Sequence, residues 1–175
     1  MEINHIFGKL YAFKFKGAYL NEFYSAFEVW TDVELMKTFF ELHEQDLNSG
    51  FYQNIISINE AVIYTQNEAY DFEELLEHYV NSDKLDSIFM DLDTKQYKHN
   101  IEVKKAYGIE YKSWLRLYAL KVEDIYLITG SAIKLTKTMN EREHTNRELL
   151  KIEWCKDFLK SEGALGTAAI KELET

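Results

Sequence analysis

The sequence predicts an α+β protein in which helices pack against a small antiparallel sheet. Apolar residues recur mostly at helical spacing before residue 100, and afterwards they alternate with polar residues as they do in strands. The strands of the second half follow one another through short turns, and strands joined in this way must be antiparallel. We therefore expect the order strand, helices, three strands and a closing helix.

The 175 residues are enough for one domain with a sizeable core, because 46% of them are hydrophobic and 15% are aromatic. No proline-rich or serine-rich linker and no internal repeat divides the sequence. We expect a single domain over residues 1–175, with an acidic helical part over about 20–95 and a strand module over about 96–160.

The first half of the chain contains one predicted strand followed by helices. A capping box of Thr31 and Glu34 indicates where one helix begins, because each side chain can accept a hydrogen bond from a free backbone N–H of the first turn. Residues 55–64 fit either a strand or a helix. The predicted elements are a strand over residues 10–16 and helices over about 21–30, 32–48 and 68–81.

The second half contains predicted strands and a closing helix. Glu123 and Asp124 would form the turn between the last two strands, although this turn lacks glycine. Thr145 and Glu148 make a second capping box, which predicts the start of the closing helix. The residues after Ala164 show little pattern, and we expect them to fray. The predicted elements are strands over about 101–106, 113–122 and 125–130, an extended segment over 132–138 and a helix over about 146–160.

Some apolar residues lie on the apolar side of their predicted elements, and these are expected to be buried. Because they repeat at the spacing of one helix face or one strand face, their burial tests which face of each predicted element is turned toward the core. The predicted core residues are Leu35, Phe39, Phe72, Leu76, Leu117, Ile128 and Ile152.

Charge is distributed unevenly along the chain. Residues 1–95 contain 6 Lys and no Arg against 18 Asp and Glu, a net charge of −12, whereas residues 96–160 contain 13 Lys and Arg against 9 acids, a net charge of +4. The net charge of the whole chain, −10, opposes nonspecific binding to nucleic acid or anionic membranes. Because salt screens charges over about 8 Å, a local basic surface can still bind phosphate. The acidic part could mask the basic part, bind a basic partner or only maintain solubility.

Several classes of site and location have no signature in the sequence. No segment approaches the ~18 to 20 apolar residues of a membrane span, and the first residues lack the pattern of a signal peptide, so we expect a cytoplasmic protein with no membrane partner. The single Cys155 excludes an internal disulfide, and its apolar helical position indicates a buried structural thiol. The histidines are scattered, so we expect no metal site and no cofactor. Asp91 and Asp93 could share a magnesium ion, but a surface turn is the preferred interpretation.

The region after residue 100 carries a recognisable order of motifs. The strand Trp114–Leu120 contains an arginine and aromatic residues, the apolar strand Ile125–Gly130 follows, and then come the Lys- and Thr-rich segment Ala132–Thr138 and the helix from Thr145. This order resembles the RelE superfamily of bacterial toxins, in its HigB and phage-derived branch. The resemblance covers about residues 101–160, and before that only the order of elements agrees.

The resemblance implies a toxin of a toxin–antitoxin system, an endoribonuclease that cleaves ribosome-bound mRNA. Its partners would be an antitoxin protein and the ribosome with its mRNA. Cleavage by the ribose 2′-hydroxyl needs a base, an acid and a cation for the phosphoryl oxygens. The resemblance implies catalytic roles for Arg116, Tyr118 and His144, with Arg116 binding phosphate, Tyr118 stacking a base or donating a proton, and His144 acting as acid or base. Lys134 and Lys137 would bind RNA.

Two other interpretations remain open. The chain is longer and more acidic than members of this family, with residues 20–95 as an insertion after the first strand. It could therefore be a non-catalytic RelE-like binding module whose acidic helical half recruits a protein partner. Alternatively the site residues are structural, with Tyr118 in the core, His144 near a helix cap and the lysines in solvent.

Overall fold

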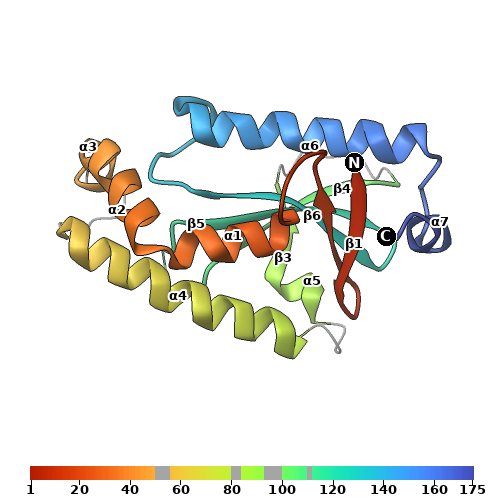
Figure 1. Cartoon of the computed structure of the whole chain (residues 1–175), viewed down its shortest axis with the longest axis horizontal. Coiled ribbons are helices and arrows are strands. Elements are labelled where there is room, and N and C mark those ends of the chain that lie inside the picture. Colours follow the sequence, from red (N-terminus) through yellow and green to blue (C-terminus); the bar gives the residue numbers. More distant parts are fainter. Residues whose placement is uncertain (50–55, 80–83, 93–99, 110–111) are drawn as a thin grey trace.

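The structure, a computed structural model, describes residues 1–49, 56–79, 84–92, 100–109 and 112–175. In this part of the chain a mixed sheet lies between two layers of helices (Figure 1). Helices of the first half cover one side of the sheet, and a long helix near the C-terminus covers the other. The predicted α+β class is confirmed.

The strands are β1 (Glu2–Phe7), β2 (Leu10–Lys14), β3 (Phe89–Asp91), β4 (Glu102–Tyr107), β5 (Leu115–Val122) and β6 (Ile125–Ile133). Among the described residues they form one sheet in the order β1-β2-β6-β5-β4-β3. β2 is parallel to β6, and the other neighbours are antiparallel. The expectation of a wholly antiparallel sheet is therefore wrong for β2 and β6. These strands are connected through several helices and three strands, so no tight turn forces them to be antiparallel.

The order of elements also differs from the predicted one. The sequence does not predict β1, which forms a hairpin with β2, or the short β3, which extends the sheet beyond β4. The turn predicted at Glu123 and Asp124 does join β5 to β6. Glu123 takes the left-handed conformation there (φ 53°), and its carboxylate accepts a hydrogen bond of 2.9 Å from the backbone N–H of Thr167. This contact supports a backbone conformation that usually requires glycine.

The helices are α1 (Glu22–Thr31), α2 (Val33–Leu42), α3 (Glu44–Leu47), α4 (Ile58–Tyr79), α5 (Leu85–Ile88), α6 (Glu143–Ser161) and α7 (Thr167–Glu172), with a 3₁₀ turn over Met139–Glu141. The predicted helix over 21–30 is α1, whereas the predicted helix over 32–48 is divided into α2 and α3. Thr31 does not cap α2, because its hydroxyl donates to the carbonyl of Phe27 within α1. Asp32 caps α2 instead and accepts a hydrogen bond from the N–H of Leu35.

The ambiguous segment before residue 65 is helical from Ile58 onward, whereas residues 56 and 57 precede the helix. α4 begins at Ile58 and includes most of the helix predicted over 68–81; residues 50–55 and 80–83 lie outside the described part. Ser57 and Glu60 form a capping box at this start, because the backbone N–H of Ser57 donates to Glu60 and the backbone N–H of Glu60 donates to the Ser57 hydroxyl. The helix is thus longer than its apolar pattern indicates.

The closing helix is present as α6, but its predicted capping box is wrong. Thr145 lies within the helix, and its hydroxyl donates to the carbonyls of Met139 and Arg142. A capping box joins Thr138 and Glu141 in the preceding 3₁₀ turn instead. The side of α6 that faces the sheet repeats at alternating steps of three and four residues, as expected for a helix on a sheet. Its buried residues are Thr145, Glu148, Ile152, Cys155 and Leu159.

The C-terminal residues are ordered against the sheet, contrary to the expectation that they fray. Ile170 of α7 is fully buried, and the backbone N–H of Thr175 donates to the carbonyl of Ile3 in β1. The two termini therefore lie close together, as Figure 1 shows. No helix within the described ranges is both long and apolar enough to cross a membrane.

Most of the residues that the sequence predicts to be buried do lie in the core. Leu35 is 49% exposed and Phe39 is only half-buried, whereas their neighbours Met36 and Phe40 are buried. Both pairs have the spacing of one helix face, so the sequence does not distinguish them. Packing of α2 against α1 and α4, with Phe40 against Trp114, selects the second pair. The confirmed core residues are Phe72, Leu76, Leu117, Ile128 and Ile152.

Candidate functional site

A pocket of about 590 Å³ opens on the α6 side of the sheet, beside the segment that follows β6. We call it the cationic pocket. Its described lining contains four positively charged side chains and no carboxylate. The described lining residues are Lys105, Arg116, Lys134 and Lys137, the aromatic Tyr107 and Tyr118, the polar Thr138 and Asn140, and the apolar Leu92, Met139 and Leu149.

The pairing of β4 with β5 brings the first charges together. Lys105 lies opposite Tyr118, and Tyr107 lies opposite Arg116. Directly opposed residues of antiparallel strands share one face, and so do alternate residues of one strand, so all four side chains lie on the α6 side. Lys134 continues β6, where its backbone N–H donates to the carbonyl of Trp114 just before β5. The sheet therefore collects residues from three separate segments.

Arg116 is held firmly in the pocket. The side chain is 7% exposed, and its guanidinium carbon lies 3.9 Å from the centroid of the Tyr107 ring. Nη1 donates hydrogen bonds of 2.7 Å to the carbonyls of Ser113 and Leu115. Stacking and hydrogen bonding together fix the plane of the guanidinium, which is the group that proteins use to bind two oxygens of one phosphate.

Lys134 and Lys137 form the outer wall. Nζ of Lys134 donates to the carbonyls of Thr136, at 2.6 Å, and Lys137, at 2.7 Å, so this ammonium organises the turn that carries Lys137. Burial and the positive charges of Arg116 and Lys105 lower the pKa of Lys134 to about 8, although Glu141 acts in the opposite direction. Lys134 is therefore charged at neutral pH but loses its proton more readily than an ordinary lysine.

Lys105 and Tyr107 are site residues that the sequence reasoning missed. Lys105 donates to the carbonyl of Leu92 and lies 5.7 Å from the centroid of the Tyr107 ring. The two residues alternate within the predicted strand 101–106 and its extension, so they share a strand face. If this strand is paired with the predicted strand that carries Arg116, Lys105 and Tyr107 can be expected beside Arg116, and this pairing would have identified them.

Tyr118 and His144 differ in how they lie relative to the cationic pocket. Tyr118 is 1% exposed, so it belongs to the core under α6 as well as lining the cationic pocket, and its ring cannot stack on a nucleotide base. His144 is not among the described lining residues. The structure brings together Arg116, Tyr118, Lys134 and Lys137 but separates His144 from them.

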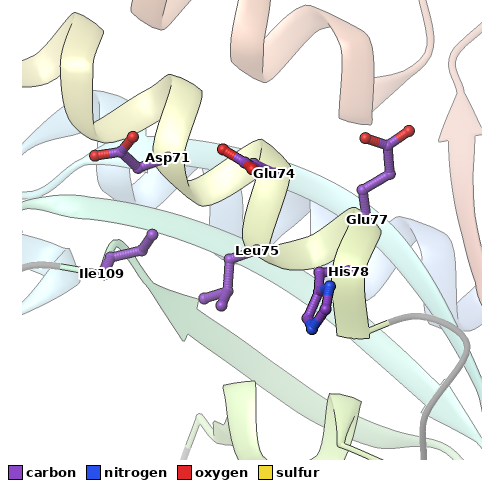
Figure 2. A pocket seen from close by; sticks show the side chains of 6 residues that line it. All are labelled: Asp71, Glu74, Leu75, Glu77, His78 and Ile109. Atoms are coloured by element: carbon purple, nitrogen blue, oxygen red, sulfur yellow. The ribbon is translucent and has the colours of Figure 1, made fainter.

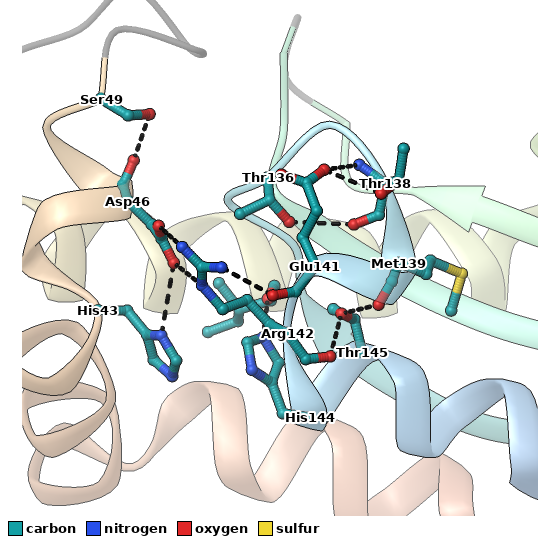
Figure 3. A network of polar contacts seen from close by, with 11 residues as sticks. His43, Asp46, Ser49, Thr136, Thr138, Met139, Glu141, Arg142, His144 and Thr145 are labelled. Atoms are coloured by element: carbon teal, nitrogen blue, oxygen red, sulfur yellow. Dashed lines mark hydrogen bonds and ion pairs between the residues drawn. The ribbon is translucent and has the colours of Figure 1, made fainter.

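His144 points toward α2 instead, where Figure 3 shows it beside His43. Its Nε2 is 2.9 Å from the carbonyl oxygen of Ile133, and its ring lies 4.7 Å from that of His43 and 5.2 Å from that of Phe39, between centroids. Burial lowers the pKa of His144. The sequence could not indicate this direction, because it depends on how the first turn of α6 faces α2.

A polar network holds the segment that carries the outer wall (Figure 3). The Thr136 hydroxyl donates to the carbonyl of Thr138, and Glu141 accepts hydrogen bonds from the backbone and the hydroxyl of Thr138. Arg142 then binds the carboxylate of Asp46 in α3. The helical half thus anchors the end of the segment that forms the pocket.

A second hollow, of about 530 Å³, has the opposite charge. Figure 2 shows Asp71, Glu74 and Glu77 of α4 around it, with His78 and apolar side chains below them. Carboxylates at this density repel phosphate, so this hollow is not an alternative nucleic-acid site. Asp91, considered as a magnesium ligand, instead forms an ion pair of 2.7 Å with Lys104, and Asp93 lies outside the described residues.

Comparison of the chain with protein-family models, with curated proteins and with solved structures finds no match in any of the three.

Proposed function

We propose that this protein binds RNA, with the phosphate oxygens of the RNA in the cationic pocket. The observation that carries the proposal is the placement of four positive side chains around one pocket of a chain whose net charge is −10. Arginine and lysine are the usual protein partners of nucleic-acid phosphates. The resemblance of residues 101–160 to RelE-like toxins favours RNA over other phosphate-bearing ligands.

The surroundings of the charges support a nucleotide-containing ligand. Thr138 and Asn140 can exchange hydrogen bonds with a sugar or a base edge, and Met139 and Leu149 supply apolar surface beside them. A volume of about 590 Å³ lies within the range of pockets that hold small organic ligands.

Fluorescence anisotropy with labelled single-stranded RNA at several salt concentrations tests this proposal. Lys137→Ala should weaken binding and reduce the slope of log affinity against log salt by about one unit, because one phosphate contact is lost. Lys137 is exposed, so this variant should fold normally. Lys171→Ala in α7 removes an exposed lysine elsewhere and is the matched control. Wild-type protein that shows no salt-dependent RNA binding would contradict the proposal.

A second candidate function is cleavage of ribosome-bound mRNA by a RelE-like toxin. In this reaction the 2′-oxygen forms a bond to phosphorus, the bond from phosphorus to the 5′-oxygen breaks, and a base and an acid move one proton each. Since His144 lies elsewhere, Lys134 is the residue beside Arg116 whose pKa, about 8, suits proton transfer. Arg116 would stabilise the charge on the phosphoryl oxygens.

Induced expression separates cleavage from binding alone. If the protein is a toxin, wild type should arrest growth and cleave mRNA, and Lys134→Arg, which retains the charge but not the readily lost proton, should not. RNA binding without cleavage would favour the non-catalytic module. In that case the acidic helical half would be the part to test for a protein partner.

A further inference from the structure

The positive charges of the cationic pocket converge on one place instead of following a track. Nζ of Lys105 and the guanidinium carbon of Arg116 lie 5.7 and 3.9 Å from the centroid of the same Tyr107 ring. Nζ of Lys134, which lines the same pocket, lies 2.7 Å from the carbonyl oxygen of Lys137 and is close enough to Arg116 and Lys105 to feel their charges. An RNA backbone that runs across a surface needs cations spaced along its path, and this arrangement is different.

Charges that converge in this way repel one another. Burial is the largest cause of the lowered pKa of Lys134, and the positive charges of Arg116 and Lys105 lower it further, as this repulsion requires. Glu141 offsets part of the repulsion, but its carboxylate is also occupied by the backbone N–H and the hydroxyl of Thr138. A ligand that carries several negative charges in a small volume would relieve the repulsion best.

The number of charges distinguishes two kinds of phosphate. An internal phosphodiester carries one negative charge, and its neighbours lie farther along the chain. A terminal phosphate monoester carries about −1.5 to −2 at pH 7, and it presents three oxygens to surrounding donors. Terminal di- and triphosphates concentrate still more charge. The positive charge of the cationic pocket therefore matches a phosphorylated end better than a point in the middle of a chain.

We propose that the cationic pocket binds the terminal phosphate of a nucleotide unit, as present at the 5′ end of an RNA chain or on a free nucleotide. This inference rests on the phosphate binding of the proposed function, whether the phosphate belongs to RNA or to a free nucleotide, and makes no use of cleavage. Arg116 would bind two phosphate oxygens through its fixed plane, and the three lysines would surround the others. Met139 and Leu149 would lie beside the attached nucleoside.

The test uses one RNA sequence labelled at its 3′ end and carrying a 5′-hydroxyl, a 5′-monophosphate or a 5′-triphosphate. Anisotropy should show the phosphorylated forms binding about tenfold tighter or more. Lys137→Ala should abolish this preference, and Lys171→Ala should preserve it. AMP, ADP and ATP should compete for the pocket, and they identify a free nucleotide as the ligand if they bind while RNA does not.

The possible failures can be distinguished. Equal binding of the three RNAs, weakened by Lys137→Ala, would overturn this inference and leave the proposed RNA binding intact. A preference for 5′-phosphate that Lys137→Ala, Lys105→Ala and Lys134→Ala all leave unchanged would place the terminal phosphate outside the cationic pocket. If neither RNA nor nucleotide binds, both proposals are wrong. Circular-dichroism melting of each variant confirms that the comparison is made between folded proteins.

Discussion

Arg142 donates hydrogen bonds from Nε and Nη2 to the two carboxylate oxygens of Asp46, which precedes it by 96 positions; the Nε bond is 2.7 Å long. This is the bidentate geometry in which an arginine–carboxylate pair is strongest. The pair connects α3 to the end of the segment that carries Lys134 and Lys137. The acidic helical half therefore supports the cationic pocket in addition to changing the net charge.

Asp46→Asn should lower the melting temperature by a few degrees and weaken phosphate binding, because Arg142 would lose its charged partner. Arg142 holds the pKa of Asp46 below its usual value, so the pair stabilises the protein above the pKa of the unfolded carboxyl and this contribution is lost at acid pH. The difference between the two proteins should accordingly disappear as the pH falls. Glu143→Gln, which breaks an exposed pair with Arg147, is the control and should change little.

The lowered pKa of Lys134 predicts that phosphate affinity depends on pH. Affinity should fall as the pH rises from 7 to 9, because Lys134 loses its proton near pH 8 while the phosphate charge no longer changes. Titration calorimetry at several pH values measures this dependence. Lys134→Arg should remove most of it, since arginine stays protonated. An equally steep dependence in Lys134→Arg would show that another group is responsible.

Gly130 and Glu148 predict a destabilisation that a second substitution relieves. A Cβ at Gly130 would lie 1.8 Å from Oε2 of Glu148 and 2.7 Å from Nζ of Lys151. Gly130→Ala should lower the free energy of unfolding by about 1 to 3 kcal/mol, as overpacked sites do. Urea unfolding should show that the combination with Glu148→Ala costs less than the sum of the single changes. Strict additivity would mean that the two side chains do not meet.

Glu148 also predicts a slope in stability against pH. Burial raises its pKa to about 7 despite the neighbouring Lys151. Below the pKa of the unfolded carboxyl, about 4.3, this group does not oppose folding, and as the pH rises toward 7 its ionisation progressively disfavours the folded state. Glu148→Gln should flatten this part of the profile in urea unfolding between pH 4.5 and 7. A profile that the substitution leaves unchanged would contradict the assignment.

Two adjacent residues of α2 should respond very differently to truncation to alanine. Met36→Ala should cost about 2 to 5 kcal/mol, because Met36 is 2% exposed in the core. Leu35→Ala should change the free energy of unfolding by less than about 0.5 kcal/mol, since Leu35 is 49% exposed. Urea midpoints of the two variants measure the difference. Equal costs would show that the helix face is assigned incorrectly.

Much of the fold could be predicted because secondary structure leaves a local pattern. The strand predicted over 113–122 is β5, the turn at Glu123 and Asp124 is present, and the helix predicted over 146–160 lies within α6. Capping boxes were less reliable. Thr31 and Thr145 have the correct spacing to a glutamate, but each hydroxyl donates to a backbone carbonyl instead, because where a helix begins depends on what its first turn packs against.

Part of the candidate site can also be predicted, because strand pattern and charge are local features of the sequence. Arg116 and Lys134 lie in the region whose strand pattern and positive charge are visible in the sequence, and the structure gathers them with Lys137. The position of His144 in the sequence and the chemistry of its imidazole suit a catalytic acid or base, yet its side chain is directed to α2. Lys105 appeared unremarkable until the pairing of β4 with β5 placed it beside Arg116.

Composition and periodicity predict the α+β class, the identity of most elements and the concentration of positive charge after residue 95, because both are properties of neighbouring residues. Three features depend instead on tertiary contacts: the parallel pairing of β2 with β6, the burial of Met36 in place of Leu35 and the direction of His144. In each case the local sequence pattern does not distinguish the alternatives. Contacts between segments far apart in the sequence select one of them, and no local pattern records such contacts.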